Sequence, residues 1–257
     1  MNAELKRTLK RAAWLLGIFL VFILIVSAVE RKEESRVARM DVSIEPLPGG
    51  YLLIDAADVR QLIKRSFGYH LEEQPVGILD VERVERVLEE DPFVLDAEVH
   101  IDAKNEVKIE VLQREPVLRI IDDNGLDYYL DSEGMKLPLS KHFTARVLVA
   151  TGNIPPHSPD FLQRKKHLLK DLFQLAKLIL ADEFLKSLLE QIYVNQGEFV
   201  LIPKVGDQKI LLGKFENVED KLERLNIFYQ KGIPYEGWQK YKTINLKFKN
   251  QVVCGKV

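Results

Sequence analysis

The sequence predicts an α+β protein that begins with a transmembrane helix. Three observations lead to this prediction: an uncharged apolar run over residues 12–29, a strand–helix–helix–strand–strand pattern over 35–113, and many short strand patterns with interposed helical ones over 114–257. The chain has 257 residues, of which 46% are hydrophobic, so it can bury more than one apolar core. Its single cysteine excludes an internal disulfide and a cysteine-rich metal site.

The charges follow the same segments. Residues 1–11 carry a net charge of +3, residues 30–113 carry 11 basic and 20 acidic side chains, and residues 114–257 carry 22 basic and 18 acidic side chains. The overall net charge of −2 therefore combines a basic tail, an acidic module and a mildly basic module. A total so close to neutral also argues against a chain devoted to nucleic acid.

Residues 12–29 form the predicted membrane anchor. Eighteen uncharged residues in a helix cover ~27 Å, which is about the thickness of the hydrocarbon core of a bilayer. The cations of residues 1–11 favour a cytoplasmic N-terminus. A cleaved signal peptide is the alternative, because Val26-Ser27-Ala28 resembles a cleavage site, although the apolar run is longer than signal peptides usually have. Both interpretations place residues 30–257 outside the cytoplasmic membrane.

Residues 35–113 are predicted to form a small module of order β-α-α-β-β. After a first strand, one helix begins at an N-cap at Asp55, and a second begins at Asp80 and ends before Pro92. Two alternating segments then form a hairpin around a turn at 103–105, with these apolar residues facing one way: Leu95, Ala97, Val99, Ile101, Val107, Ile109 and Val111. The acidic residues of the second helix are most simply a solvated face, with a docking surface as the alternative: Glu82, Glu85, Glu89 and Glu90.

Residues 114–257 are predicted to form a mixed sheet with interposed helices. The expected strands lie at 117–121, 128–131, 146–150, 192–195, 199–202, 210–212, 244–248 and 252–254. A long helix is expected to begin at Asp160, a short one to span 182–189, and a last one to be capped by Asn217. The second module is thus larger and richer in strands than the first.

Catalytic and metal-binding motifs are missing from the sequence. It contains no nucleophile elbow, phosphate-binding loop, zinc-protease motif or dinucleotide fingerprint, and its five histidines lie apart. Cys254 has no histidine near it in sequence and is predicted to be a small packing residue on a strand. We therefore expect no enzyme activity, no cofactor and no metal, with a cell-wall enzyme as a remote alternative.

The order of these parts resembles the FtsQ/DivIB cell-division family. The matching residues are Asp91-Pro92-Phe93-Val94 before the hairpin, Gln113-Arg114-Glu115-Pro116-Val117 at the junction, Tyr129-Leu130-Asp131 with Gly134, Leu137-Pro138, and Gly213 to Leu225 leading into Ile244 to Phe248. The resemblance implies that residues 35–113 are a POTRA domain and that 114–257 are a β domain. The family pattern Ile-Asp-Leu-Arg-Tyr is here Ile244-Asn245-Leu246-Lys247-Phe248, and a lysine cannot make the bidentate carboxylate pair of an arginine.

The resemblance implies a non-enzymatic scaffold of the divisome. Such a protein would span the cytoplasmic membrane once, with its N-terminus in the cytoplasm and its bulk in the periplasm. Its partners would be FtsB- and FtsL-like division proteins and, through them, the septal peptidoglycan synthase. The alternative is a POTRA-bearing transport or chaperone component of the cell envelope, which would accept client strands at the edge of the acidic module.

The end of the chain is the predicted partner-binding site. A last strand exposes unpaired backbone groups to which a partner strand can add, and nearby lysines would steer an acidic partner segment. The same lysines could instead only protect the edge from aggregation. The predicted site residues are Lys247, Phe248, Lys249, Asn250, Gln251, Val252, Val253 and Cys254.

Overall fold

The computed structural model describes residues 3–237 and 240–256. The chain divides into two compact units, Met1–Gln113 and Arg114–Val257, and each is considered by itself. Both units combine helices with a β-sheet, so the α+β class predicted from the sequence is confirmed.

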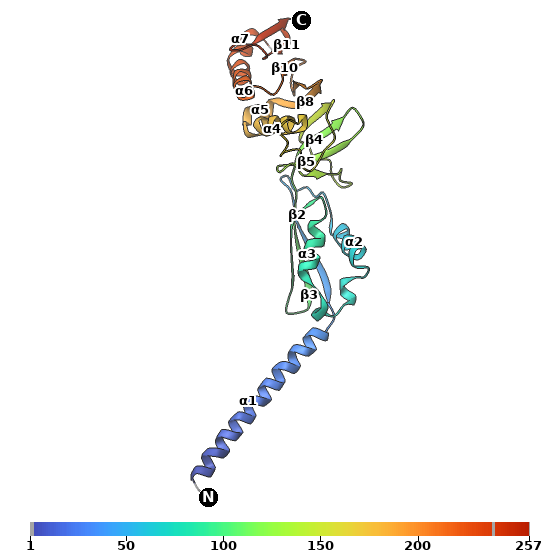
Figure 1. Ribbon diagram of the computed structural model, residues 1–257, viewed down its shortest axis with the longest axis vertical. Coiled ribbons are helices and arrows are strands. Elements are labelled where there is room, and N and C mark those ends of the chain that lie inside the picture. The colour runs from blue at the N-terminus through green and yellow to red at the C-terminus, as the bar shows by residue number, and fades with distance from the viewer. Residues whose placement is uncertain (1–2, 238–239, 257) are drawn as a thin grey trace. The chain divides into compact units, whose positions relative to one another are not determined.

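The first unit begins with one long helix, α1 (Ala3–Glu34) (Figure 1). The apolar side chains along its middle are exposed, from Trp14 at 74% to Val26 at 40%. Within the described residues, no helix has both the length and the hydropathy of a membrane span. The transmembrane helix predicted at 12–29 is thus left without support from the structure.

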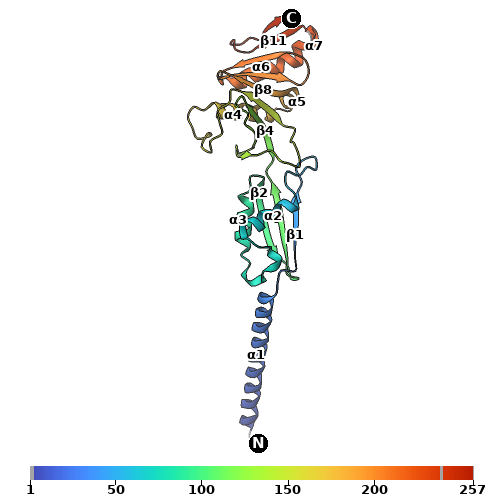
Figure 2. The same ribbon diagram turned by 90° about the vertical axis from the view of Figure 1, so that its right-hand side faces the viewer.

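The rest of the first unit has the predicted order β-α-α-β-β. Its sheet has the strand order β1-β3-β2, in which β3 lies parallel to β1 and antiparallel to β2. The helices α2 and α3 cover one face of this sheet (Figure 2). The elements are β1 (Arg39–Glu45), α2 (Ala56–Phe67), the short 3-10 helices η1 (Leu71–Glu73) and η2 (Val76–Ile78), α3 (Val81–Glu89), β2 (Val94–Ile101) and β3 (Glu106–Gln113).

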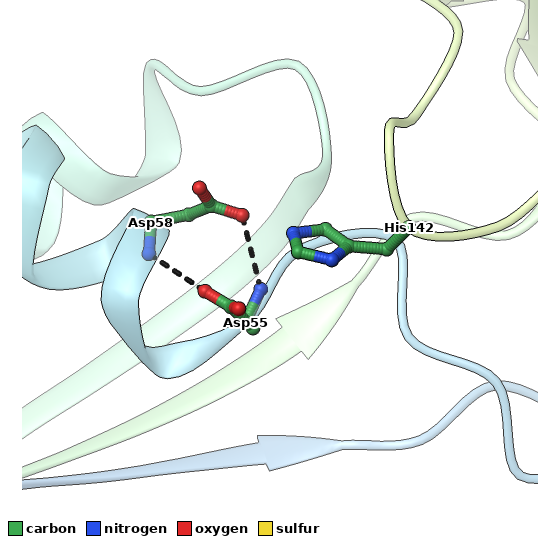
Figure 3. A group of neighbouring side chains, drawn as sticks. All are labelled: Asp55, Asp58 and His142. Carbon is green, nitrogen blue, oxygen red and sulfur yellow. Dashed lines mark hydrogen bonds between the residues drawn. The ribbon is translucent and has the colours of Figure 1, made fainter.

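Both helices of this unit begin at aspartates, as predicted. Asp55 Oδ1 accepts a hydrogen bond from the Asp58 backbone N–H at 2.8 Å, and Asp58 Oδ2 accepts one from the Asp55 N–H at 3.3 Å (Figure 3). This reciprocal capping box satisfies two N–H groups at the start of α2. Asp80 caps α3 through the Arg83 N–H. His142, also drawn in Figure 3, belongs to the second unit.

The prediction for Leu95 is wrong. Leu95 is 43% exposed, whereas Val94 is buried. The register between β2 and β3 shifts between Val94 and Asp96, which marks a bulge. Because an extra residue in one strand reverses the side on which its neighbours point, the alternation of Ala97 and Val99 does not extend back to Leu95.

The second unit contains a mixed sheet of nine strands in the order β12-β11-β10-β9-β8-β7-β4-β5-β6. Its strands are β4 (Pro116–Asp122), β5 (Asp127–Asp131), β6 (Lys136–Leu137), β7 (Leu148–Gly152), β8 (Leu189–Asn195), β9 (Glu198–Pro203), β10 (Lys209–Gly213), β11 (Tyr241–Asn245) and β12 (Val253–Lys256). Its helices are α4 (Leu168–Ala181), α5 (Glu183–Leu188), α6 (Val218–Ile227), the π-helix η3 (Phe228–Gly232) and α7 (Ile233–Glu236).

One face of this sheet forms the core of the unit. A row of paired residues crosses seven strands on this face: Ile120, Ala150, Ile192, Leu201, Ile210, Ile244 and Cys254. Buried side chains of α4, α5 and α6 belong to this core, and Figure 1 shows these helices beside the strands of the sheet. The last strand therefore belongs to the same sheet and the same core as the first.

Several predicted boundaries in this unit differ from the structure, and the strand expected at 192–195 begins already at Leu189. The long helix begins at Leu168 and not at Asp160, because the chain between them forms turns that place Phe161 against Phe173, with the rings edge to face at 5.9 Å. The strand expected at 146–150 runs from Leu148 to Gly152. The strand expected at 244–248 ends at Asn245.

The cap predicted at Asn217 is only partly correct. Asn217 does occupy the position before α6, but its side chain makes no capping hydrogen bond. Its backbone is in the left-handed region, with φ of 49°, which asparagine tolerates better than most residues. The backbone conformation therefore accounts for asparagine at this position.

Candidate partner-binding edge

The strand β12 forms one edge of the nine-stranded sheet. It pairs with β11 in antiparallel register, with Asn245 opposite Val253, Ile244 opposite Cys254 and Thr243 opposite Gly255. Among the strands of the described chain, none pairs with its other side. The backbone N–H and C=O groups on that side are therefore available to another strand.

The predicted site residues fall on two elements. Val253 and Cys254 lie on β12, and the six residues from Lys247 to Val252 lie in the connection between β11 and β12. Val252 and Cys254 are half-buried against the core, in keeping with a packing role for the cysteine. Phe248 and Val253 are 47% and 41% exposed and are the apolar side chains that a partner could cover.

Lys247 is already paired within the unit. Its Nζ donates to the Glu198 carboxylate on β9, and this hydrogen bond lowers the pKa of Glu198. Lys242, Lys249 and Lys256 are exposed and make no ion pair with any described residue. The positive charge available to a partner therefore comes from these three lysines rather than from Lys247.

Arg224, on α6, organises the connection to β12, and the sequence prediction missed it. One of its terminal nitrogens, Nη1, donates to the carbonyl oxygens of Phe248, at 2.9 Å, and Gln251. Nη2 donates to the carbonyl oxygen of Leu246 at 3.4 Å. The i,i+4 spacing to Asp220 is visible in the sequence, but the three carbonyl contacts span more than twenty residues and leave no local pattern.

Two further buried groups lie on the elements that support this edge. The Nζ of Lys221 donates to the carbonyl oxygen of Lys214 at 3.1 Å, and burial lowers the pKa of this lysine. Burial raises the pKa of Tyr229 to about 12, and the electrostatic interaction with Cys254 adds to the effect. Lys221 and Tyr229 are only 8% and 2% exposed, so α6 and η3 are closely packed in this part of the unit.

Comparison with known families identifies both units. A family model described as FtsQ/DivIB, C-terminal related, matches residues 115–255, which include all of β12 except its last residue, Lys256. A model described as a POTRA-like domain matches residues 48–112. No match to the chain is found among the curated proteins.

Proposed function

The chain belongs to the FtsQ/DivIB family, and we propose that it is a non-enzymatic scaffold of bacterial cell division that binds its partner by strand addition at β12. The observation that carries this proposal is the position of β12 at the end of the sheet order, with one side unpaired among the described strands. A partner strand would continue the nine-stranded sheet there through main-chain hydrogen bonds.

The proposed partners are FtsB- and FtsL-like division proteins, with the septal peptidoglycan synthase joined through them. The three exposed lysines near the edge, Lys242, Lys249 and Lys256, support an acidic partner segment, because opposite charges steer encounter and suppress wrong partners. The partly exposed Phe248 and Val253 would supply the apolar part of the contact.

The proposed location is the cytoplasmic membrane, with a single span at 12–29, the N-terminus in the cytoplasm and the bulk of the chain in the periplasm. The uncharged run of eighteen residues and the cations that precede it support this location. A divisome protein acting on cell-wall synthesis needs its binding domains on the outer side of that membrane.

The alternative function is a transport or chaperone component that binds client strands at β1 or β2, the two edges of the first sheet. The two functions differ in which unit binds. The family match over 115–255, which covers the second unit almost completely, favours the division scaffold.

Binding can be measured with the full chain in detergent and the purified extracytoplasmic segment of the FtsB-like protein from the same cell. We expect a chain ending after Asn250, which lacks β12, to lose binding. Lys136→Pro, which alters β6 at the opposite edge of the same sheet, is the matched control and should bind like the wild type. Unchanged affinity after the truncation would disprove strand addition at β12.

The charges provide a second arm of the same experiment. Lys249→Glu with Lys256→Glu should slow association and weaken its dependence on salt, since exposed charges act mainly on the association rate. Lys165→Glu is the control: it changes charge in the same direction at an exposed position before α4, away from β12 in the sheet order. Equal association rates for the two charge variants would show that the lysines only protect the edge.

A further inference from the structure

The connection between β11 and β12 is too long to fix the pairing of these strands by itself. It contains the seven residues 246–252, whereas tight hairpins usually have about two to five. β12 has only four residues, and the pairing shifts register between Tyr241 and Thr243. Short pairing and a long connection make a strand prone to fray or slip, so another group has to hold it.

Arg224 makes the contacts that this requires. Its guanidinium donates to three carbonyl oxygens of the connection, those of Leu246, Phe248 and Gln251. Its Nε donates to Asp220 Oδ2 at 3.0 Å, one turn earlier on α6, which orients the guanidinium. The side chain of Arg224 is only 15% exposed, so water competes poorly for these hydrogen bonds.

Only an arginine can make this set of contacts. A guanidinium presents five N–H donors in a rigid plane, so one side chain can satisfy three carbonyl oxygens and a carboxylate together. A lysine ammonium has three donors at a single point and cannot reach oxygens spread over six residues of chain. Arg224 alone therefore joins α6 to the connection in this way.

We propose that Arg224 is the positioning residue of the partner-binding edge: by holding residues 246–251 against α6, it keeps β12 in register with β11. The expected consequence for partner binding rests on the proposed function of β12. The effect on the strand itself is a property of the free protein and can be tested without a partner.

Amide hydrogen exchange of the full chain in detergent measures this effect directly. Arg224→Gln should speed exchange in β12 roughly ten- to hundredfold, because it removes charge-assisted hydrogen bonds of the connection. The amides of β8 and β9, in the middle of the same sheet, should keep their wild-type rates. Unchanged exchange in β12 would disprove the inference, whatever the binding result.

Arg164→Gln is the matched control. Arg164 also pairs with an aspartate four residues earlier, Asp160, but both described hydrogen bonds of its side chain go to that carboxylate. This substitution should leave exchange in β12 unchanged. Arg224→Lys keeps the charge beside Asp220 and serves as the second variant if Arg224→Gln does not fold; it should still speed exchange in β12.

A cross-link separates positioning from direct contact with the partner. Thr243→Cys with Gly255→Cys, in a Cys254→Ser background, places two thiols directly opposite each other on β11 and β12, because a Cβ at position 255 would lie 3.8 Å from the Cβ of residue 243. Relative to the same cysteine variant with Arg224 intact, oxidation should restore slow exchange and FtsB-like partner binding to Arg224→Gln. Slow exchange without restored binding would show that Arg224 touches the partner itself. Absence of binding by the wild type would disprove the proposed function and leave the exchange result intact.

Discussion

At the scale of single residues, one aspartate closes each of three hairpins in the same way. The Oδ1 atoms of Asp102, Asp122 and Asp131 each accept hydrogen bonds from the backbone N–H groups two and four residues later. The residue three positions after each aspartate has a positive φ and is Asn105, Gly125 or Gly134. The turns predicted from composition are confirmed, because this chemistry is contained in five consecutive residues.

Asp131 also has a longer-range contact. Its Oδ2 accepts from Arg114 Nη1 at 3.0 Å, and its side chain is only 4% exposed. The same aspartate therefore closes a local turn and ties the first residue of the second unit to β5. Removing either partner of a pair so well buried costs more than removing one partner of an exposed pair, because it leaves a buried charge unpaired.

Two of these glycines allow a test of packing against backbone strain. Gly125 and Gly134 have nearly equal φ, 84° and 86°, but a Cβ on Gly134 would lie 3.0 Å from Phe161, whereas nothing lies within 4 Å at Gly125. Both alanine substitutions should cost about 1 kcal/mol for the left-handed backbone, and Gly134→Ala about 1 kcal/mol more for displacing the phenyl ring. Urea unfolding measures both; equal losses would show that Phe161 yields freely.

At the scale of elements, the local signals of the first unit agree with its structure. The capping box at Asp55, the cap at Asp80 and the left-handed Gly68 after α2 all lie within a few residues of the helix ends that they determine. The bulge before Ala97 has no such local signal in the sequence. It depends on how β2 pairs with β3, which is a different segment of the chain. Periodicity therefore predicted the hairpin and failed at its first residues.

The bulge yields a test at the same scale. Val94→Ala should destabilise the first unit by about 1–2 kcal/mol because Val94 is buried, whereas Leu95→Ala should cost at most about 0.5 kcal/mol although it removes more atoms. Thermal unfolding of the full chain measures both. A larger loss for Leu95→Ala would mean that β2 follows the regular alternation and has no bulge.

At the scale of the whole molecule, Gln113 closes the first unit. This last residue of β3 is buried, and its Oε1 accepts from the N–H groups of Leu53, at 2.6 Å, and Ile54. Its Nε2 donates to the carbonyl oxygen of Glu45 at 2.8 Å. One side chain thus joins the end of β1, the segment that leads into α2, and β3 immediately before the second unit begins.

Because each unit has its own hydrophobic core, a substitution in one unit should change the stability of that unit alone. Gln113→Leu removes the hydrogen bonds that its side chain makes with the N–H groups of the buried Leu53 and Ile54 and with the Glu45 carbonyl, and it should destabilise the first unit by about 2–4 kcal/mol, with the second unit unchanged. Gly152→Ala should do the reverse, because its Cβ would lie 2.1 Å from the Val194 carbonyl oxygen in the second unit. Hydrogen exchange resolved along the full chain distinguishes the units; a loss spread over both in either variant would show that they unfold together.

The sequence by itself determined the α+β class, the order of strands and helices in the first unit, and most helix caps and turns. Each of these depends on residues that are close together in the chain, where periodicity, proline, glycine and capping side chains act. The same local reasoning extended the penultimate strand to Phe248, three residues beyond its end at Asn245.

Only the tertiary structure decided the parallel pairing of β11 with β10, the pairing of Lys247 with Glu198 and the contacts of Arg224 with the connection. The physical reason is the same in all three: the atoms that meet come from segments twenty or more residues apart, and the free energy of their contact depends on how the strands and α6 pack. A pattern of apolar residues predicts that a strand exists, but which side of it remains unpaired depends on the whole sheet.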